Sequence, residues 1–505
     1  MGRSDILRLG LAASFVLAIM LLLLMRVDAG AGGNLLIVAA MIGGYMAMNI
    51  GANDVANNVG PAVGSKALTM LGAILIAAIF EASGALLAGG DVVSTIKKGI
   101  IDPALISDAN VFIWLMMAAL LAAAIWLNLA TAIGAPVSTT HSIVGGVLGA
   151  GIAAAGWEIA NWGTMAQIAA SWVISPVLGG VIAASFLYLI KRTIIFKADK
   201  ISAAVTMVPL LIAVMTWAFS VYLILKGFKK LWNLNFISAT SAGLLIAVAA
   251  FFLVRPLVVR AAKKLSNDRA SIGELFTLPL IFSAAMLSFA HGANDVANAV
   301  GPLAAINDAV MSGGVASKAG IPLWVMLIGA LGIAIGLALY GPKLIRTVGG
   351  EITELDKMRA FCVALAAAIT VILASQLGLP VSSTHIAVGG IFGVGFLREY
   401  LESSQDRLIA EIKDHYEGES PEVANAFLDR FEAADIKDRG AILKEMKKSR
   451  SLVKSDRKRL RKAYKKELVK RSMALKIAAA WIITVPAAGV LAAIIYFVIR
   501  TIMQG

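Results

Sequence analysis

The stretch GANDVANNVGP at residues 51–61 returns almost unchanged as GANDVANAVGP at residues 292–302. A second matching pair follows in the same order, with PVSTTHSIVGG at 136–146 and PVSSTHIAVGG at 380–390. The first pair is offset by 241 residues and the second by 244, so the chain carries two copies of one unit. Internal duplication of this kind is common among secondary transporters.

Outside these motifs the chain is strongly apolar. Of its 505 residues 59% are hydrophobic, whereas soluble domains average about 45–50%. Thirteen apolar runs are each long enough, at about 17–25 residues, to cross about 30 Å of hydrocarbon. They lie at 7–25, 34–50, 67–90, 111–133, 137–156, 164–190, 204–226, 236–254, 274–290, 322–341, 359–378, 381–397 and 474–499. The sequence therefore predicts an all-α polytopic membrane protein with about 11–13 hydrophobic segments, including re-entrant or broken helices.

The order of the runs also predicts how the chain is divided. If every run crosses, seven crossings separate the two GAND segments, and this odd number makes the two repeats inverted. The predicted regions are an N-terminal segment with the first span (1–33), transport repeat 1 (34–190), a linking region with two spans (191–273), transport repeat 2 (274–398), a charged insert (399–472) and the last span (473–505). The insert is acidic in its first half and basic in its second, with apolar residues at helical spacing, so we expect cytoplasmic helices. Its basic half either lies against anionic headgroups or forms a solvated hairpin.

Charge and cysteine content exclude several classes of protein. Much of the net charge of +14 lies in short loops and in the insert, as expected for cytoplasmic segments, so nucleic acid is not an expected partner. The single cysteine, Cys362, excludes an intramolecular disulfide framework and a thiolate metal cluster. Arg3, Arg8 and the apolar run to Met25 have some features of a signal peptide, but the length of the run and the many later spans favour a retained first span.

The GAND motifs place costly polar side chains inside apolar segments. Asn53 and Asn57 are four residues apart, as are Asp54 and Asn58, so a helix would align each pair on one face. The glycines and the proline of the motif favour a helix break with free backbone groups. Amide oxygens with one carboxylate per copy suit Na⁺, and an aspartate that takes up a proton would serve H⁺ instead. A polar packing seam would explain one or two asparagines, but not an aspartate flanked by asparagines in both copies.

Three hydroxyl residues follow the proline of the second motif in each copy. They are Ser138, Thr139 and Thr140 in the first copy and Ser382, Ser383 and Thr384 in the second. A helix that begins here would direct unpaired N–H groups and about half a positive charge at an anion, and the hydroxyls would add donors. Simple capping needs one hydroxyl and not three, so we interpret the two triplets as one anion site shared between the copies.

Histidines and one isolated acid complete the candidate residues. His141 and His385 end the hydroxyl motifs, and His291 precedes the second GAND, where the first copy has Ile50. Each histidine either relays protons or bonds a carbonyl, and the sequence leaves both roles open. Glu81 lies alone in the apolar run IFEASGALL and is a candidate for ion coupling.

At these residues the sequence resembles the inorganic phosphate transporter (PiT) family. The resemblance rests on GANDVANNVGPAVGSKALT, HGANDVANAVGPLA, GLPVSSTH and IFEASGALL…TIKKGIID, in that family's order. It implies an inverted-repeat symporter whose phosphate site contains Asp54, Asn57, Asp295, Asn298 and the two hydroxyl triplets. It further implies that Asn53 and Asn294 bind a cation beside the two aspartates, and that Glu81 is linked to transport.

Two departures from the family pattern matter. Many members carry an acid in the helix before the second hydroxyl motif, where this chain has Ala364, so the coupling ion stays open between Na⁺ and H⁺. The insert at 399–472 differs from the large central loop of animal members, so no role is carried over to it.

We therefore expect a symporter, and not an enzyme, that imports inorganic phosphate with Na⁺ or H⁺ by alternating access. We expect it to need no organic cofactor and to lie, as a multi-pass protein, in the plasma or inner membrane of a bacterium, with a homo-oligomer left open. A sulfate permease of the same family is the nearest alternative, but sulfate at pH 7 has no proton to donate to Asp54 or Asp295. An anion channel fits less well because sealed helix breaks favour occlusion. An intramembrane Ser-His-Asp hydrolase lacks a nucleophile-elbow pattern in this sequence.

Overall fold

The computed structural model describes residues 3–27, 30–135, 137–228, 234–312, 321–350, 355–401, 429–430 and 471–504. The chain divides into two compact units, residues 1–394 with 472–505, and residues 395–471. The predicted helices of the insert at 399–472 lie almost entirely outside the described residues.

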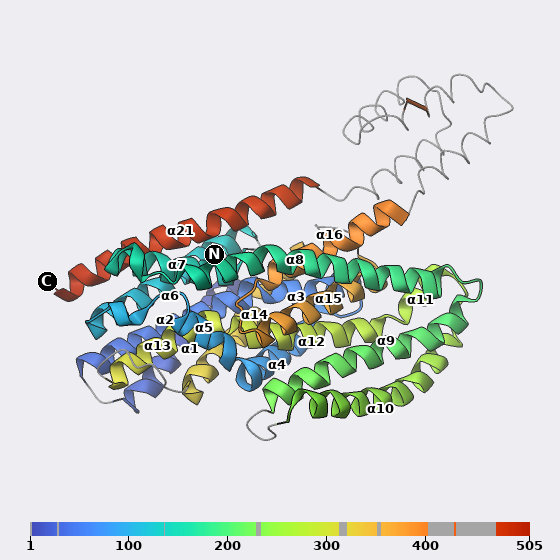
Figure 1. The fold of residues 1–505 in the computed structure, drawn as a ribbon, viewed down its shortest axis with the longest axis horizontal. Helices are drawn as coiled ribbons and strands as arrows, with labels where there is room; N and C mark the ends of the chain where they lie inside the picture. Colours follow the sequence, from blue (N-terminus) through green and yellow to red (C-terminus); the bar gives the residue numbers. More distant parts are fainter. Residues whose placement is uncertain are drawn as a thin grey trace. The chain divides into compact units, whose positions relative to one another are not determined.

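Helices make up nearly all of the described chain (Figure 1). Up to the end of the linking region they are α1 (Arg3–Leu24), α2 (Ala31–Asn53), α3 (Val55–Gly64), α4 (Met70–Ala88), α5 (Gly90–Lys98), α6 (Ala109–Ile133), α7 (Thr139–Ala155), α8 (Trp162–Ile190), α9 (Lys200–Tyr222) and α10 (Phe236–Ala262). The second half contains α11 (Arg269–Glu274), α12 (Thr277–Asp295), α13 (Ala297–Ser312), α14 (Leu323–Gly350), α15 (Lys357–Gln376), α16 (Ser383–Leu401) and α21 (Arg471–Gln504).

Eleven helical segments of the described chain are long and apolar enough to cross a membrane. Two shorter apolar helices, Thr139–Ala155 and Ser383–Leu397, correspond to the predicted runs 137–156 and 381–397. The prediction of an all-α polytopic protein with about 11–13 hydrophobic segments is therefore confirmed.

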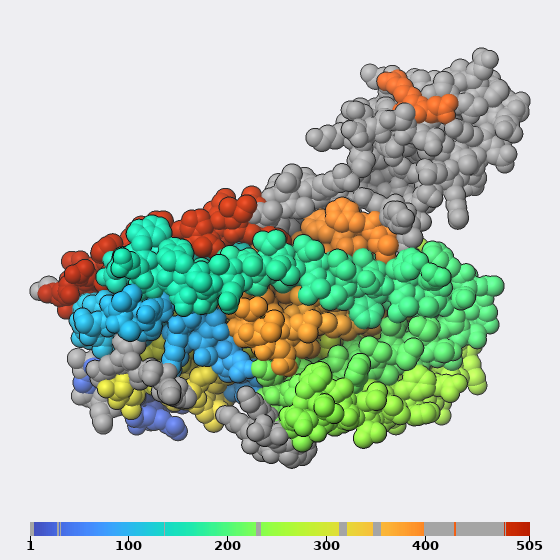
Figure 2. All heavy atoms as spheres, in the orientation of Figure 1, coloured from blue at the N-terminus to red at the C-terminus, as the bar shows by residue number. Residues whose placement is uncertain are grey.

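The outer helices have the surface expected beside lipid. Helices α8, α9 and α10 lie on the face of the molecule seen in Figure 2. Large apolar side chains of these helices are exposed, among them Val173 and Val177 of α8 and Leu245 and Leu253 of α10. Hydrocarbon is as apolar as these side chains, so the pattern suits a membrane and would be unfavourable in water.

The two copies are interleaved, because helices of one copy pack directly against helices of the other. A Cβ atom on Gly84 of α4 would lie 1.9 Å from the carbonyl oxygen of Phe289 on α12, so the two backbones are in direct contact. In the other pair, a Cβ on Gly336 of α14 would lie 1.9 Å from the carbonyl oxygen of Met48 on α2. Met48 and Phe289 are equivalent residues of the two copies, and such reciprocal contacts are those of two units related by a two-fold axis.

The helix interruption in the first GAND segment lies at its aspartate. The sequence predicts a break at the glycines and the proline, but Pro61 and Pro302 lie inside α3 and α13. The interruption comes at Asp54, between α2 and α3, and Asp54 keeps near-helical angles of φ −80° and ψ −36°. A proline frees the carbonyl four residues before it, which for Pro61 is that of Asn57 and not that of Asp54. The first GAND segment is therefore interrupted at Asp54 with only a small departure from helical geometry.

Candidate functional site

Each hydroxyl triplet begins a helix after a turn that requires glycine. Gly134 and Gly378 have φ of 77° and 66°, in the left-handed region that favours glycine. Ser138 then caps α7 by accepting a hydrogen bond from the backbone N–H of His141 at 3.1 Å. Ser382 accepts the equivalent bond from His385 at 3.3 Å. The first hydroxyl of each triplet is therefore a helix cap, and the remaining hydroxyls are those available to a ligand.

One threonine from each triplet donates a hydrogen bond to Asp54. Thr139 of the first copy donates its hydroxyl hydrogen to Asp54 Oδ2 at 2.6 Å, and its oxygen lies 3.4 Å from Asp295 Oδ2. Thr384 of the second copy donates to Asp54 Oδ1 at 2.9 Å. All four side chains are buried, so these hydrogen bonds form away from water. The structure thus brings one hydroxyl from each copy to one carboxylate.

Two asparagines cross between the copies in opposite directions. Asn57 of the first copy donates to Thr384 Oγ1 at 2.8 Å. Asn298 of the second copy donates to Thr139 Oγ1 at 3.0 Å and to Thr140 Oγ1 at 3.2 Å. The hydroxyl of Thr140 in turn donates to the carbonyl of Val381, in the loop before α16. The residues predicted for an anion site are therefore grouped at one place.

Asn53 and Asn294 hold the loops that lead into the hydroxyl helices. The bonds of Asn53 join its Nδ2 to Thr131 Oγ1 (2.9 Å) and Ala135 O (3.2 Å), and its Oδ1 to Val137 N (3.2 Å). The bonds of Asn294 join its Nδ2 to Ser375 Oγ (3.0 Å) and Leu379 O (3.1 Å), and its Oδ1 to Val381 N (3.3 Å). This bracing role was not predicted, although aligning the copies would have paired Thr131 with Ser375. Their assignment as cation ligands stays a prediction.

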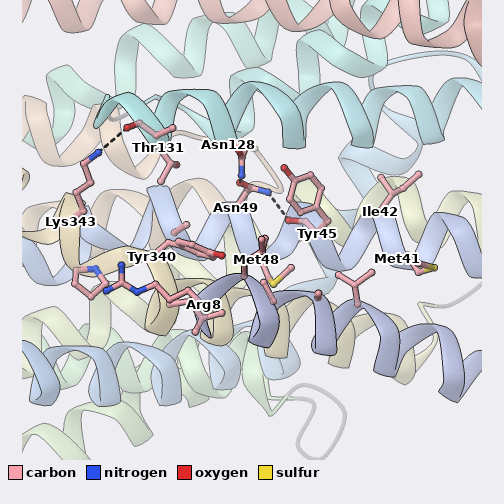
Figure 3. A pocket seen from close by; sticks show the side chains of 18 of the residues that line it. Arg8, Met41, Ile42, Tyr45, Met48, Asn49, Asn128, Thr131, Tyr340 and Lys343 are labelled. Atoms are coloured by element: carbon pink, nitrogen blue, oxygen red, sulfur yellow. Dashed lines mark hydrogen bonds between the residues drawn. The ribbon is translucent and has the colours of Figure 1, made fainter. Parts of the chain in front are cut away.

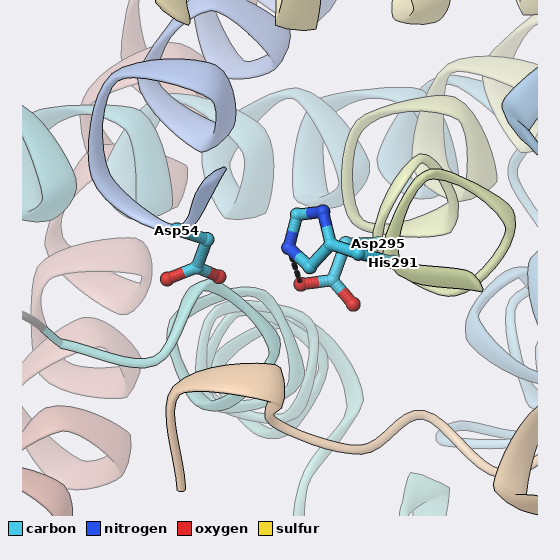
Figure 4. A group of neighbouring side chains, drawn as sticks. All are labelled: Asp54, His291 and Asp295. Atoms are coloured by element: carbon cyan, nitrogen blue, oxygen red, sulfur yellow. Dashed lines mark ion pairs between the residues drawn. The ribbon is translucent and has the colours of Figure 1, made fainter. Parts of the chain in front are cut away.

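His291 connects Glu81 with Asp295 in the buried centre. Its Nδ1 lies 2.8 Å from Glu81 Oε2, and its Nε2 lies 3.0 Å from Asp295 Oδ2. Asn58 donates to the other oxygen of Glu81 at 2.7 Å. Figure 4 shows the imidazole beside Asp295, with the carboxylate of Asp54 across from it. A neutral imidazole has one N–H, so hydrogen bonds from both nitrogens to carboxylates would need a second proton, on the ring or on one carboxyl group.

Several oxygens at this centre lack a hydrogen-bond partner within the described part of the chain. They are Asn58 Oδ1, Asp295 Oδ1, Asn298 Oδ1 and Ser383 Oγ. Buried polar atoms are rarely left unpaired, so this group is suited to a ligand. Asp54, His291 and Asp295 can each offer one ligand atom, with all three atoms within 4.8 Å of one another. Two carboxylates and neutral oxygens are donors suited to a hard cation such as Na⁺.

His141 and His385 form a separate aromatic cluster. The ring of His141 lies 3.8 Å from that of Trp172, and the ring of His385 lies 3.5 Å from that of Trp481, centre to centre. The two histidine rings are 4.4 Å apart and meet edge to face. No ring nitrogen of either makes a hydrogen bond to a side chain within the described residues. The four predicted coupling candidates therefore fall into two groups, with Glu81 and His291 apart from this pair.

Comparisons with known proteins identify related chains. The sequence profile of the phosphate transporter family matches residues 50–492. A Helicobacter pylori protein (strain ATCC 700392 / 26695) described as "Putative phosphate permease" is 54% identical over 507 residues, 98% of this chain and 95% of that one. A Pyrococcus abyssi protein of the same description is 41% identical over 364 residues, 72% of this chain and 89% of that one. The solved structure entitled "The sodium-dependent phosphate transporter" is 31% identical, with a TM-score of 0.76 over 93% of this chain and 100% of that chain.

Proposed function

The chain belongs to the phosphate transporter family, and we propose that it is a secondary active symporter that imports inorganic phosphate with Na⁺ or H⁺. We place phosphate at one site between the two copies, lined by Asp54, Asp295, Asn57, Asn298 and the hydroxyl triplets. The observation that carries the proposal is the crossed network in which Thr139 and Thr384, from opposite copies, both donate to Asp54. Two independent sites would not share a carboxylate.

The network suggests how a cation and an anion are coupled. Each threonine hydroxyl has one hydrogen, and those of Thr139 and Thr384 are directed at Asp54. A cation or a proton on the carboxylates would remove the charge that attracts these hydrogens. The hydroxyls would then be available to an anion, together with the N–H groups at the starts of α7 and α16. Cation binding would thus favour phosphate binding, and by linkage phosphate would favour the cation.

The site contains donors for either coupling ion. For Na⁺, the unpaired Asp295 Oδ1 and Asn298 Oδ1 belong to one helix interruption and supply hard oxygen ligands. For H⁺, His291 lies between two carboxylates, and an imidazole there can take up and release a proton. The name of the solved relative favours Na⁺ for that protein.

Phosphate suits the site better than sulfate does. Two carboxylates lie in the centre, and no arginine or lysine occurs in either GAND motif or either hydroxyl motif. At pH 7 phosphate still carries protons that it can donate to Asp54 or Asp295, whereas sulfate carries none.

The deciding measurement is uptake into proteoliposomes. Labelled phosphate is offered under an imposed Na⁺ gradient and then under an H⁺ gradient, each with the other ion at equilibrium. Accumulation above equilibrium under one gradient supports symport and identifies the ion. Equilibration alone under both gradients would contradict coupling, and equal inhibition by sulfate and by unlabelled phosphate would contradict selectivity for phosphate. We place the protein in a bacterial plasma or inner membrane, where both gradients are available.

A further inference from the structure

We propose that the cavity between α1, α2, α6 and α14 binds an anionic phospholipid. The cavity has a volume of about 1200 Å³, and twenty of the residues that the structure describes line it. Pockets for small molecules span about 300–1000 Å³. An inorganic anion would leave most of this space empty, whereas a two-chain lipid is a molecule of the appropriate size.

The two ends of the cavity differ in chemical character. Arg8, Tyr340 and Lys343 gather at one end, and Met41 and Ile42 lie at the other (Figure 3). Twelve of the twenty lining residues are apolar, which disfavours a small hydrated ion. A phospholipid has the same polarity, with a charged headgroup at one end and hydrocarbon at the other.

The positive charge of the cavity lining favours a lipid with an anionic headgroup. Among the lining residues that the structure describes there are three cationic side chains, those of Arg8, Lys343 and Arg346, and no acidic one. The nearby Asp5 is 3.9 Å from Arg8, on the exposed side of α1, and offsets part of this charge. Lys343 donates to the carbonyl of Ala132 at 2.8 Å, which fixes its amine at the cationic end. Basic pockets between transmembrane helices are a known kind of site for anionic headgroups.

The cavity also adjoins the loop that carries the first hydroxyl triplet. Its wall includes Thr131, whose hydroxyl oxygen accepts a hydrogen bond from the side-chain amide of Asn53. It also includes Ala132, whose carbonyl accepts a hydrogen bond from Lys343. A bound lipid would therefore contact the end of α6, where Thr131 helps to position this loop. The binding proposal itself does not depend on the proposed function.

Lipid retention by the full-length protein in detergent tests the proposal. Native mass spectrometry measures how much phosphatidylglycerol and how much phosphatidylcholine, with identical acyl chains, stay bound. We expect a preference for phosphatidylglycerol that falls about fivefold for each arginine removed in Arg8→Gln and Arg346→Gln. The matched control, Lys263→Gln with Lys264→Gln, removes two exposed cations outside the cavity and should leave the preference unchanged.

A second variant tests the apolar part of the cavity. Val16→Trp fills space between the helices and leaves all three cations in place, so it should lower retention of phosphatidylglycerol. Equal retention of the two lipids by the unmodified protein would overturn the proposal. So would a preference that survives the double arginine change. A different result would show a pocket for free anions instead: millimolar inorganic phosphate displaces the lipid, and Val16→Trp does not change lipid retention.

Discussion

Thr384, in the second hydroxyl triplet, donates a hydrogen bond of 2.9 Å to Asp54, which lies 330 residues earlier in the chain. Thr139 donates to the other oxygen of the same carboxylate at 2.6 Å. Asp54 therefore receives a hydroxyl from each copy, whereas Asp295 lies against His291. The two equivalent aspartates have different surroundings because Ile50 occupies in the first copy the place of His291 in the second.

Replacing either aspartate should abolish coupled uptake. Asp54→Asn and Asp295→Asn each remove the carboxylate charge on which a cation depends, so we expect phosphate accumulation to fall at least tenfold while insertion is unchanged. Uptake into proteoliposomes under the driving gradient is the measurement. Asp199→Asn is the control, because Asp199 is exposed and caps α9 with an oxygen that asparagine keeps. Normal accumulation by both mutants would refute the role of the two carboxylates.

The two threonines should act on one anion. Thr139→Val and Thr384→Val each remove one donor, and we expect each to weaken phosphate binding by about tenfold, as for loss of a charge-assisted bond. The double mutant should be little worse than either single mutant, since both residues serve one site. Equilibrium binding of labelled phosphate to purified protein measures this, with Thr193→Val as the control, because Thr193 is half-buried and its hydroxyl donates to the carbonyl of Leu189. Two phosphates per chain, with one lost in each mutant, would rule out a shared site.

Loss of the loop-bracing asparagines should destabilise the protein in both copies alike. Asn53→Ala leaves backbone groups of the loop before α7 without partners, at a cost of about 1–3 kcal/mol for a buried group. Asn294→Ala should have a similar effect on the loop before α16. Apparent melting temperatures in detergent report this change, and titration with Na⁺ shows whether cation affinity falls as well. If neither variant lowers the melting temperature, bracing is not what these residues contribute.

The close helix crossings should tolerate no side chain. Gly84→Ala and Gly336→Ala each place a methyl group 1.9 Å from a backbone carbonyl oxygen, so we expect little folded protein from either variant. The control is Gly90→Ala, because a Cβ at Gly90 would meet nothing within 4 Å. The yield of monodisperse protein after size-exclusion chromatography decides the outcome. Normal yields of both crossing variants would mean that the helices can separate without cost.

The charged insert should be dispensable for transport. Replacing residues 402–470 with a short flexible linker should leave uptake within about twofold of the full chain, since no site residue lies there and residues 395–471 form a unit of their own. A well-folded deletion without uptake would assign the insert a role in transport.

The sequence was sufficient for the spans, because run length is a local signal, and the repeated motifs named residues that the structure brings close together. The offset between the motifs predicted two copies, and run length predicted the spans. The glycines and the proline indicated that the GAND segment can break but not where, and packing places the interruption at Asp54 while Pro61 lies inside α3. The bracing by Asn53 was missed because its partners lie 78 to 84 residues away, at a loop whose geometry no local pattern shows. The pairing of His141 with Trp172 was missed for the same reason.

The interleaving of α4 with α12 and of α2 with α14 affects how the protein can be made. When the ribosome has completed α4, its partner helix has not yet been synthesised, because the contact between Gly84 and Phe289 spans about two hundred residues. The helices synthesised first must therefore remain in the bilayer, without the partners of their close-packing faces, until the second copy has been inserted. Biogenesis of the first half is incomplete without the second. Two halves produced as separate polypeptides would be expected to mature only when they are made together.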